Sequence, residues 1–140
     1  MDIYFAASIR GGRKYLSNYK KIVAHIIENG HSVLTEHVIL DDVIEQESKF
    51  TAREIFNRDI DWLNKSACMI ADVSNPSLGV GYEICYALQN KIPTLCVFQN
   101  GSSVSQMITG NSSPYLKMFE YHDFESLFVE IDHFINSLVR

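Results

Sequence analysis

Five short apolar runs, separated by segments of helical periodicity, place the strongest constraint on the fold of this 140-residue chain. The runs lie at residues 2–8, 32–36, 68–73, 94–98 and 116–121. Each has the length and the β-branched or aromatic content of a strand. Because parallel strands need a crossover between them, and helical segments supply it here, the alternation predicts an α/β protein with a parallel sheet.

The segments between these runs have the signatures of helices. Apolar residues recur at helical spacing over residues 13–27. Thr51 and Glu54 have the spacing of a capping box, which predicts the start of a second helix. A third helix is predicted at about residues 80–89, and Asp123 is expected to cap the last one. Helices are therefore expected on both faces of the sheet.

Five strands in a chain this short favour a single domain, residues 1–140, with the flavodoxin-like or Rossmann-like strand order 2-1-3-4-5. In such sheets ligands bind beyond the carboxyl ends of the strands, where the strand order reverses. The loops at residues 8–13 and 74–83 follow strands one and three. We therefore expect these two loops to lie side by side.

Composition and charge exclude several classes of protein. Hydrophobic residues make up 46% of the chain and charged residues 21%, as in soluble globular proteins. The net charge of −5 and the lack of a dense Lys/Arg block argue against binding nucleic acid along an extended face. No apolar run approaches membrane-spanning length, and the N-terminus lacks a basic leader. No membrane or nucleic-acid partner is therefore expected.

The three cysteines, Cys68, Cys85 and Cys96, are odd in number and form no CxxC pair. They indicate reduced thiols in the core of a cytoplasmic protein. The sequence contains no metal-ligand cluster, no Walker phosphate loop and no complete dinucleotide fingerprint. We expect no cofactor and no metal.

The two loops at the predicted switch point carry groups suited to an anion. The first holds Ser8, two glycines and two arginines, including Arg10, whose guanidinium can bind a phosphate; a solvated turn is the alternative. The second holds a proline, two glycines and two serines before a helix whose amide end favours anions. Glu83 follows within the first helical turn, where a glutamate can also serve the helix dipole alone.

Asp59 shares an apolar helical stripe with Ile55, Trp62 and Leu63, whereas Asp61 points away. A carboxylate on a buried face is costly unless it is paired or functional, and a structural bond to a loop amide is the alternative. Residues 38–50 are acidic and irregular, as in a mobile lid or a short exposed helix.

Two carboxylates and a tyrosine are thus expected near one crevice. Tyr4, on strand one, can direct its hydroxyl at a carboxylate there. Without a metal cluster, such a set fits cleavage of a bond that forms an oxocarbenium-like centre, with one carboxylate attacking the anomeric carbon and the other handling the leaving group.

Four blocks of the sequence resemble the 2′-deoxynucleoside 5′-monophosphate N-glycosidases of the nucleoside 2-deoxyribosyltransferase superfamily. The blocks lie at residues 4–13, 34–37, 59–63 and 77–83, in the family's order over nearly the whole chain. The resemblance implies hydrolysis of a nucleotide's N-glycosidic bond. It also implies a homodimer with shared active sites.

The resemblance assigns a role to each matched residue. Glu83 would be the nucleophile, Asp59 would assist departure of the base, and Tyr4 would orient the nucleophile. His37 matches a histidine near the base. The residues matched to the phosphate site are Ser8, Ile9, Arg10, Gly11, Ser77 and Gly79, together with Ser105 from the neighbouring subunit.

Three alternatives remain at the level of the sequence. A nucleoside 2-deoxyribosyltransferase would use the same nucleophile to exchange bases, and a ribonucleotide (CMP-type) N-glycosidase would act on a different sugar. A nucleotide-sensing module with the same fold would bind without reacting. The phosphate-binding loop favours a nucleotide over an unphosphorylated nucleoside, and Tyr4 favours a deoxy sugar.

Overall fold

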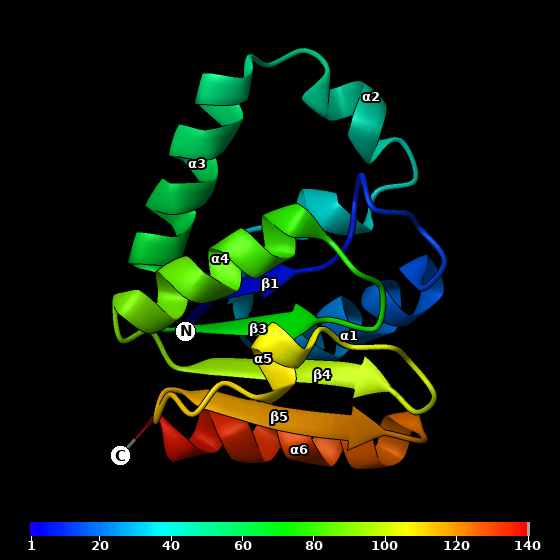
Figure 1. Ribbon diagram of the computed structural model, residues 1–140, viewed down its shortest axis with the longest axis vertical. Coiled ribbons are helices and arrows are strands. Elements are labelled where there is room, and N and C mark those ends of the chain that lie inside the picture. The colour runs from blue at the N-terminus through cyan, green and yellow to red at the C-terminus, as the bar shows by residue number, and fades with distance from the viewer. Residues whose placement is uncertain (140) are drawn as a thin grey trace.

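A computed structural model describes residues 1–139 and contains one parallel sheet of five strands. The order is β2-β1-β3-β4-β5, with every pair parallel, so the predicted order is confirmed (Figure 1). The strands are β1 (Asp2–Ala6), β2 (Ser32–Val33), β3 (Cys68–Asp72), β4 (Thr94–Gln99) and β5 (Leu116–Tyr121).

Helices cover both faces of the sheet, as predicted (Figure 1). Helices α1 and α6 pack on one face, and α3 and α4 pack on the other. The helical elements are α1 (Leu16–Glu28), the 3-10 helix η1 (Glu36–Ile39), α2 (Val43–Glu47), α3 (Ala52–Lys65), α4 (Leu78–Gln89), α5 (Gln106–Thr109) and α6 (Phe124–Ser137).

The alternation of side chains along β1 divides the core into two layers. Ile3 and Phe5 join the layer under α1 and α6, whereas Tyr4 and Ala6 join the layer under α3 and α4. The residues that form the two layers are buried, and Tyr4 is only 2% exposed. The alternation of side chains along β1 therefore places the Tyr4 hydroxyl on the same side of the sheet as α4.

The second strand is shorter than predicted, ending at Val33 rather than at residue 36. The Thr35 hydroxyl accepts a hydrogen bond from the Phe5 amide (3.0 Å) and donates one to the Phe5 carbonyl (2.6 Å). These bonds occupy the backbone groups that a longer strand would use, and the chain then turns into η1. The first strand likewise ends early, at Ala6 rather than residue 8.

The acidic segment at residues 38–50 contains the short helix α2, and most of the segment is exposed, as one of the two predicted alternatives has it. One side of α2 nevertheless packs against the protein. Val43 and Glu47 are buried, at 1% and 6% exposure.

The prediction for the cysteines is wrong in one case: Cys68 and Cys96 are buried, whereas Cys85 is exposed. No helix within residues 1–139 is both long enough and apolar enough to cross a membrane.

The starts of two predicted helices are confirmed atom by atom. The Thr51 hydroxyl accepts from the Glu54 amide (3.2 Å), and the Glu54 carboxylate accepts from the Thr51 amide (2.7 Å), which completes the capping box of α3. The Asp123 carboxylate accepts from the Ser126 amide (2.7 Å) at the start of α6.

Replacing Thr51 with alanine removes an amide acceptor from the start of α3. We expect Thr51→Ala to lower the free energy of unfolding by about 1 kcal/mol, measured by urea denaturation. Thr109→Ala is the control, because Thr109 is exposed at the end of α5. Its effect should stay within about 0.5 kcal/mol. Equal effects of the two substitutions would contradict the cap's contribution.

Candidate active site

The loops that follow β1 and β3 lie side by side at the switch point, as predicted. The Asn75 amide nitrogen donates to Ser8 Oγ and to the carbonyl oxygens of Gly11 and Gly12, each at 3.2 Å. A Cβ atom at Gly11 would lie 2.4 Å from the carbonyl oxygen of Pro76. Only glycine permits this close approach of the two backbones.

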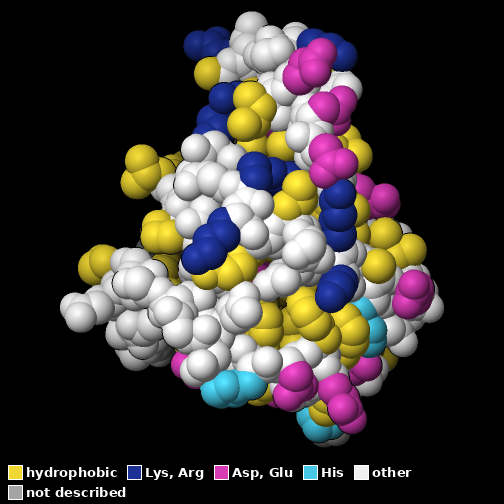
Figure 2. Space-filling view, turned by 90° about the vertical axis from the view of Figure 1, so that its right-hand side faces the viewer, with side chains coloured by type: hydrophobic (Ala, Val, Ile, Leu, Met, Phe, Trp, Pro, Cys, Tyr) yellow, Lys and Arg dark blue, Asp and Glu magenta, His cyan; other side chains and the backbone are white. Residues whose placement is uncertain are grey.

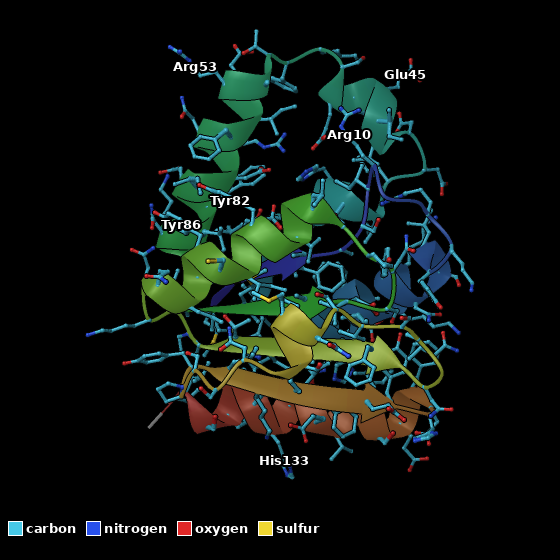
Figure 3. The ribbon with its side chains drawn as sticks, in the orientation of Figure 1. Arg10, Glu45, Arg53, Tyr82, Tyr86 and His133 are labelled. Carbon is cyan, nitrogen blue, oxygen red and sulfur yellow. The ribbon has the colours of Figure 1, made fainter. Side chains whose placement is uncertain are left out.

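The carboxyl edge of the sheet, where both loops lie, has a charged surface. Figure 2 faces this edge and shows Lys and Arg side chains across its middle, with Asp and Glu side chains above and below. The Arg10 side chain is 63% exposed and lies near α2 (Figure 3). An arginine that is exposed next to a groove is free to bind an anion.

Tyr4 and Glu83 are in direct contact. The Tyr4 hydroxyl donates a 2.8 Å hydrogen bond to Glu83 Oε1, joining β1 to the second turn of α4. Helix α4 begins at Leu78, because the Ser77 hydroxyl accepts from the Val80 amide, so Glu83 lies slightly deeper in the helix than predicted. The bond fixes one carboxylate oxygen and leaves the other available.

Burial raises the pKa of Glu83 to about 7, and the nearby carboxylates of Asp59 and Glu47 add to the rise. The Tyr4 hydrogen bond opposes it, because it stabilises the ionised carboxylate. Burial also raises the pKa of Tyr4 far above the physiological range. Tyr4 is therefore a permanent donor, and Glu83 changes its charge near neutral pH.

Asp59 projects from α3 toward the same space, and its side chain is 20% exposed. Burial raises its pKa, and a 2.8 Å bond from Arg58 Nε opposes the rise. This partner is a side chain, not the loop amide considered as the structural alternative. Asp61 points to solvent, as predicted, and it pairs with Lys65 (2.6 Å).

A cavity of about 180 Å³ collects most of the predicted site residues. It is bounded by Tyr4, Ile9, Arg10, His37, Asp59, Ser77, Gly79 and Glu83. A second cavity of about 520 Å³ shares Arg10, Asp59 and Glu83 with the first. Its outer wall is aromatic, formed by Phe50, Phe56 and Tyr82. A small cavity thus adjoins a larger one with an aromatic wall, and the three carboxylates of Glu47, Asp59 and Glu83 border both.

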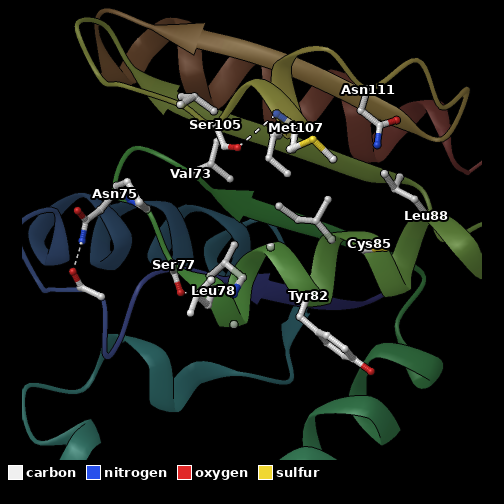
Figure 4. A pocket seen from close by; sticks show the side chains of 18 of the residues that line it. Val73, Asn75, Ser77, Leu78, Tyr82, Cys85, Leu88, Ser105, Met107 and Asn111 are labelled. Atoms are coloured by element: carbon white, nitrogen blue, oxygen red, sulfur yellow. Dashed lines mark hydrogen bonds between the residues drawn. The ribbon is translucent and has the colours of Figure 1, made fainter.

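Three predicted residues lie outside the small cavity. Ser8 is fully buried behind it, and Gly11 lies in the loop that Asn75 holds. Ser105 caps α5 and faces Ser77 and Leu78 across a groove of about 960 Å³ (Figure 4). Within one chain, Ser105 therefore does not border the space beside Glu83.

Sequence reasoning missed Glu47 and Arg58. Glu47 Oε1 accepts from Arg58 Nη2 (3.1 Å) and lies 3.3 Å from His37 Nε2, and Arg10 Nη2 is 3.9 Å from Glu47 Oε2. The bonds from His37 and Arg58 hold the pKa of Glu47 below its usual value. The only available signal was the position of Arg58 next to Asp59.

Comparisons with known proteins show the family of this chain. The sequence profile of the nucleoside 2-deoxyribosyltransferase family matches residues 3–128. A protein of Danio rerio named 5-hydroxymethyl-dUMP N-hydrolase is 38% identical over 145 residues, covering 100% of this chain and 99% of its own. A protein of Methanosarcina mazei with the provisional name 2′-deoxynucleoside 5′-phosphate N-hydrolase 1 is 43% identical, covering 98% and 85%.

Two solved structures share the fold at low sequence identity. A CMP N-glycosidase of Clostridium botulinum superposes with a TM-score of 0.70 at 14% identity, covering 96% of this chain and 99% of the other. A 2-deoxyribosyltransferase of Bacillus psychrosaccharolyticus superposes with a TM-score of 0.63 at 14% identity, covering 91% and 90%. At this identity the likeness concerns the fold alone.

The raised pKa of Glu83 predicts a pH-dependent stability. In the folded protein the pKa of Glu83 is about 7, against 4.5 for the ordinary side chain. The protonated side chain therefore adds to the free energy of unfolding at low pH, and this stabilisation is lost as the pH rises through 7. Glu83→Gln removes the buried charge. At about pH 8 we expect the variant to have a free energy of unfolding that is higher by roughly 2 kcal/mol, and this difference should disappear toward pH 4.5.

Urea denaturation at both pH values measures this difference. Glu28→Gln is the control, since Glu28 is exposed at the end of α1. The same pH dependence in both variants would contradict the assignment to Glu83.

Proposed function

Because the chain belongs to the nucleoside 2-deoxyribosyltransferase family, we propose that it hydrolyses the N-glycosidic bond of 2′-deoxynucleoside 5′-monophosphates. The products would be the free base and 2-deoxyribose 5-phosphate. The observation that carries the proposal is the Tyr4–Glu83 hydrogen bond, at a cavity that Arg10 and Ser77 also line. The names of relatives from Danio rerio and Methanosarcina mazei support the same reaction.

In the first chemical step, the free oxygen of Glu83 attacks C1′ as the bond to the base breaks. Tyr4 holds the other oxygen and directs the carboxylate. Asp59 protonates the departing base or stabilises it. Water then attacks C1′ of the glycosyl ester and releases Glu83, so the sugar retains its configuration.

The phosphate would bind at the opposite end of the sugar. Arg10 supplies a guanidinium, and Ser77 and Gly79 lie at the start of the twelve-residue helix α4. Ser8, Ile9 and Gly11 complete this end, since Gly11 brings the backbone close. Glu83 lies more than one helical turn beyond Ser77, so deoxyribose would separate the two negative charges.

The base would occupy the larger cavity. Its aromatic wall of Phe50, Phe56 and Tyr82 offers flat apolar surfaces for stacking. His37 borders the small cavity at this end and packs against Trp62 with ring centroids 5.5 Å apart. The leaving nitrogen would then face Asp59, which borders both cavities.

Base exchange is the second candidate, and the family's own name favours it. The two reactions share the glycosyl ester and differ in whether water or a second base attacks it. A panel of dNMPs, NMPs and deoxynucleosides, incubated with and without an acceptor base, separates the two. Release of free base from dNMPs alone supports hydrolysis, whereas new nucleosides formed only with acceptor base support the transferase. Binding without any release would support a sensing module.

Replacing the proposed nucleophile should abolish most of the activity. We expect Glu83→Ala to lower kcat by about 1,000-fold or more, since the substitution removes the carboxylate that forms the ester. Arg10→Met should instead act mainly on KM, because it removes phosphate binding. Its effect should vanish with unphosphorylated deoxynucleosides. Full turnover by Glu83→Ala would refute the mechanism.

We propose further that two chains form a homodimer in which Ser105 reaches the partner's phosphate site. The groove between α4 and α5 has an apolar rim, with Leu78 97% exposed and Met107 81% exposed. A second copy would cover these side chains. Each Ser105 would then lie beside a phosphate site that its own chain does not complete.

Mixed dimers test this arrangement. Ser105→Ala and Glu83→Ala should each be impaired alone, and mixing them should restore activity, because one site of each mixed dimer has both Glu83 and a partner Ser105. Sedimentation velocity gives the oligomeric state. A monomer, or a mixture no more active than its parts, would contradict the shared site.

A further inference from the structure

Arg58 connects the candidate leaving-group acid to a buried carboxylate on another element. Its Nε donates to Asp59 Oδ1 at 2.8 Å, and its Nη2 donates to Glu47 Oε1 at 3.1 Å. The three side chains are 21%, 20% and 7% exposed, so the pairs are largely shielded from water. Nη2 also lies 3.2 Å from His37 Nε2.

The pairing of Arg58 with Asp59 does not follow from helix geometry. Adjacent residues on a helix point about 100° apart, and ion pairs normally join residues three or four apart. Here the guanidinium lies over the Trp62 ring, 4.8 Å from its centroid, and 6.0 Å from that of Phe50. The stacked rings and Glu47 hold the guanidinium in place, so one donor remains aimed at Asp59.

Three carboxylates gather at the site. Glu47 raises the pKa of Asp59, and both Glu47 and Asp59 raise the pKa of Glu83. The groups facing Asp59 are Arg58 on its own helix, His37 on η1, Glu47 on α2, and Glu83 on α4 with its donor Tyr4 on β1. Arg58 lowers the pKa of both Asp59 and Glu83, and Arg10 lies farther out, toward the phosphate end.

We propose that Arg58, anchored by Glu47, is a positioning residue that fixes the Asp59 carboxylate toward the leaving base and supplies a positive charge among the carboxylates of the site. The inference rests on the proposed function. It makes α2 part of the catalytic apparatus, since α2 carries the carboxylate that holds Arg58. It also explains the burial of Glu47: Oε1 of this carboxylate pairs with both His37 and Arg58, and these contacts offset the cost of burying the charge.

The test is the pH profile of kcat and KM with the preferred dNMP. In Arg58→Met the acidic limb of the kcat profile should move to higher pH by about one unit or more. The loss of a nearby positive charge disfavours the ionised forms of both Asp59 and Glu83. At the alkaline plateau kcat should fall by up to about 100-fold, because Asp59 is no longer held, while KM changes less. Arg58→Lys should keep the limb near its original pH but lower kcat, since a single ammonium cannot serve both partners.

Arg53→Met is the matched control. Arg53 is exposed at the outer end of the same helix (Figure 3), and its loss removes the same charge. Its profile should match that of the unmodified protein. If Arg58→Met and Arg53→Met give the same limb and the same plateau, the inference is wrong.

A double-mutant cycle separates positioning from general stability. In the Asp59→Asn background, Arg58→Met should cost little more at the alkaline plateau, because the residue through which it acts is gone. An undiminished additional loss would overturn the positioning role. Failure of the proposed function has a different signature: the unmodified protein would then release no base from any dNMP.

Discussion

The parallel pairing of β1 with β3 is the constraint on which the rest of the structure depends. Its register sets Tyr4 opposite Met69 and Ala6 opposite Ala71, at the centre of the sheet. Because the two strands are parallel, the loops that follow them leave at the same edge of the sheet. Because the strand order reverses here, the helices α1 and α4 that follow the loops lie on opposite faces. Every group proposed to bind phosphate lies in these loops, except Ser105, or at the start of α4. Because side chains alternate between the two faces along β1, Tyr4 faces α4 rather than α1.

The two faces of the sheet have different tasks. The layer under α1 and α6 is a closed core, whereas the layer under α3 and α4 opens at one end into the cavities. Between the layers, Asp72 is fully buried at the end of β3 and supports the loop beyond. It accepts from the Ser74 amide (2.9 Å) and from the Tyr121 hydroxyl (3.0 Å). The Ser74 hydroxyl in turn accepts from the Gln99 amide, which ties the loop to β4.

Electrostatics at the site oppose folding and favour reaction. Burying Glu83 and Asp59 raises their pKa values, which costs stability when both are ionised. A nucleophile that is poorly solvated is also a stronger one once it is ionised, provided that a donor directs it. Tyr4 supplies that donor, and Arg58 reduces the electrostatic cost without neutralising either acid. The stability lost at Glu83 above pH 7 is the expected consequence of a site arranged for chemistry.

The sequence by itself determined the parallel sheet, its strand order, the two adjacent loops and the placement of Tyr4, Asp59 and Glu83 near one crevice. These follow from periodicities of two and 3.6, from capping residues such as Thr51 and Asp123, and from the rule for switch points. They are local or topological properties, so they can be predicted from the order of residues along the chain. Only the tertiary structure decided the early end of β2, the exposure of Cys85, and the positions of Glu47 and Arg58. Those depend on side chains that meet from segments far apart in the chain, where a hydroxyl, an aromatic face or a counter-ion becomes a partner only after the helices have packed.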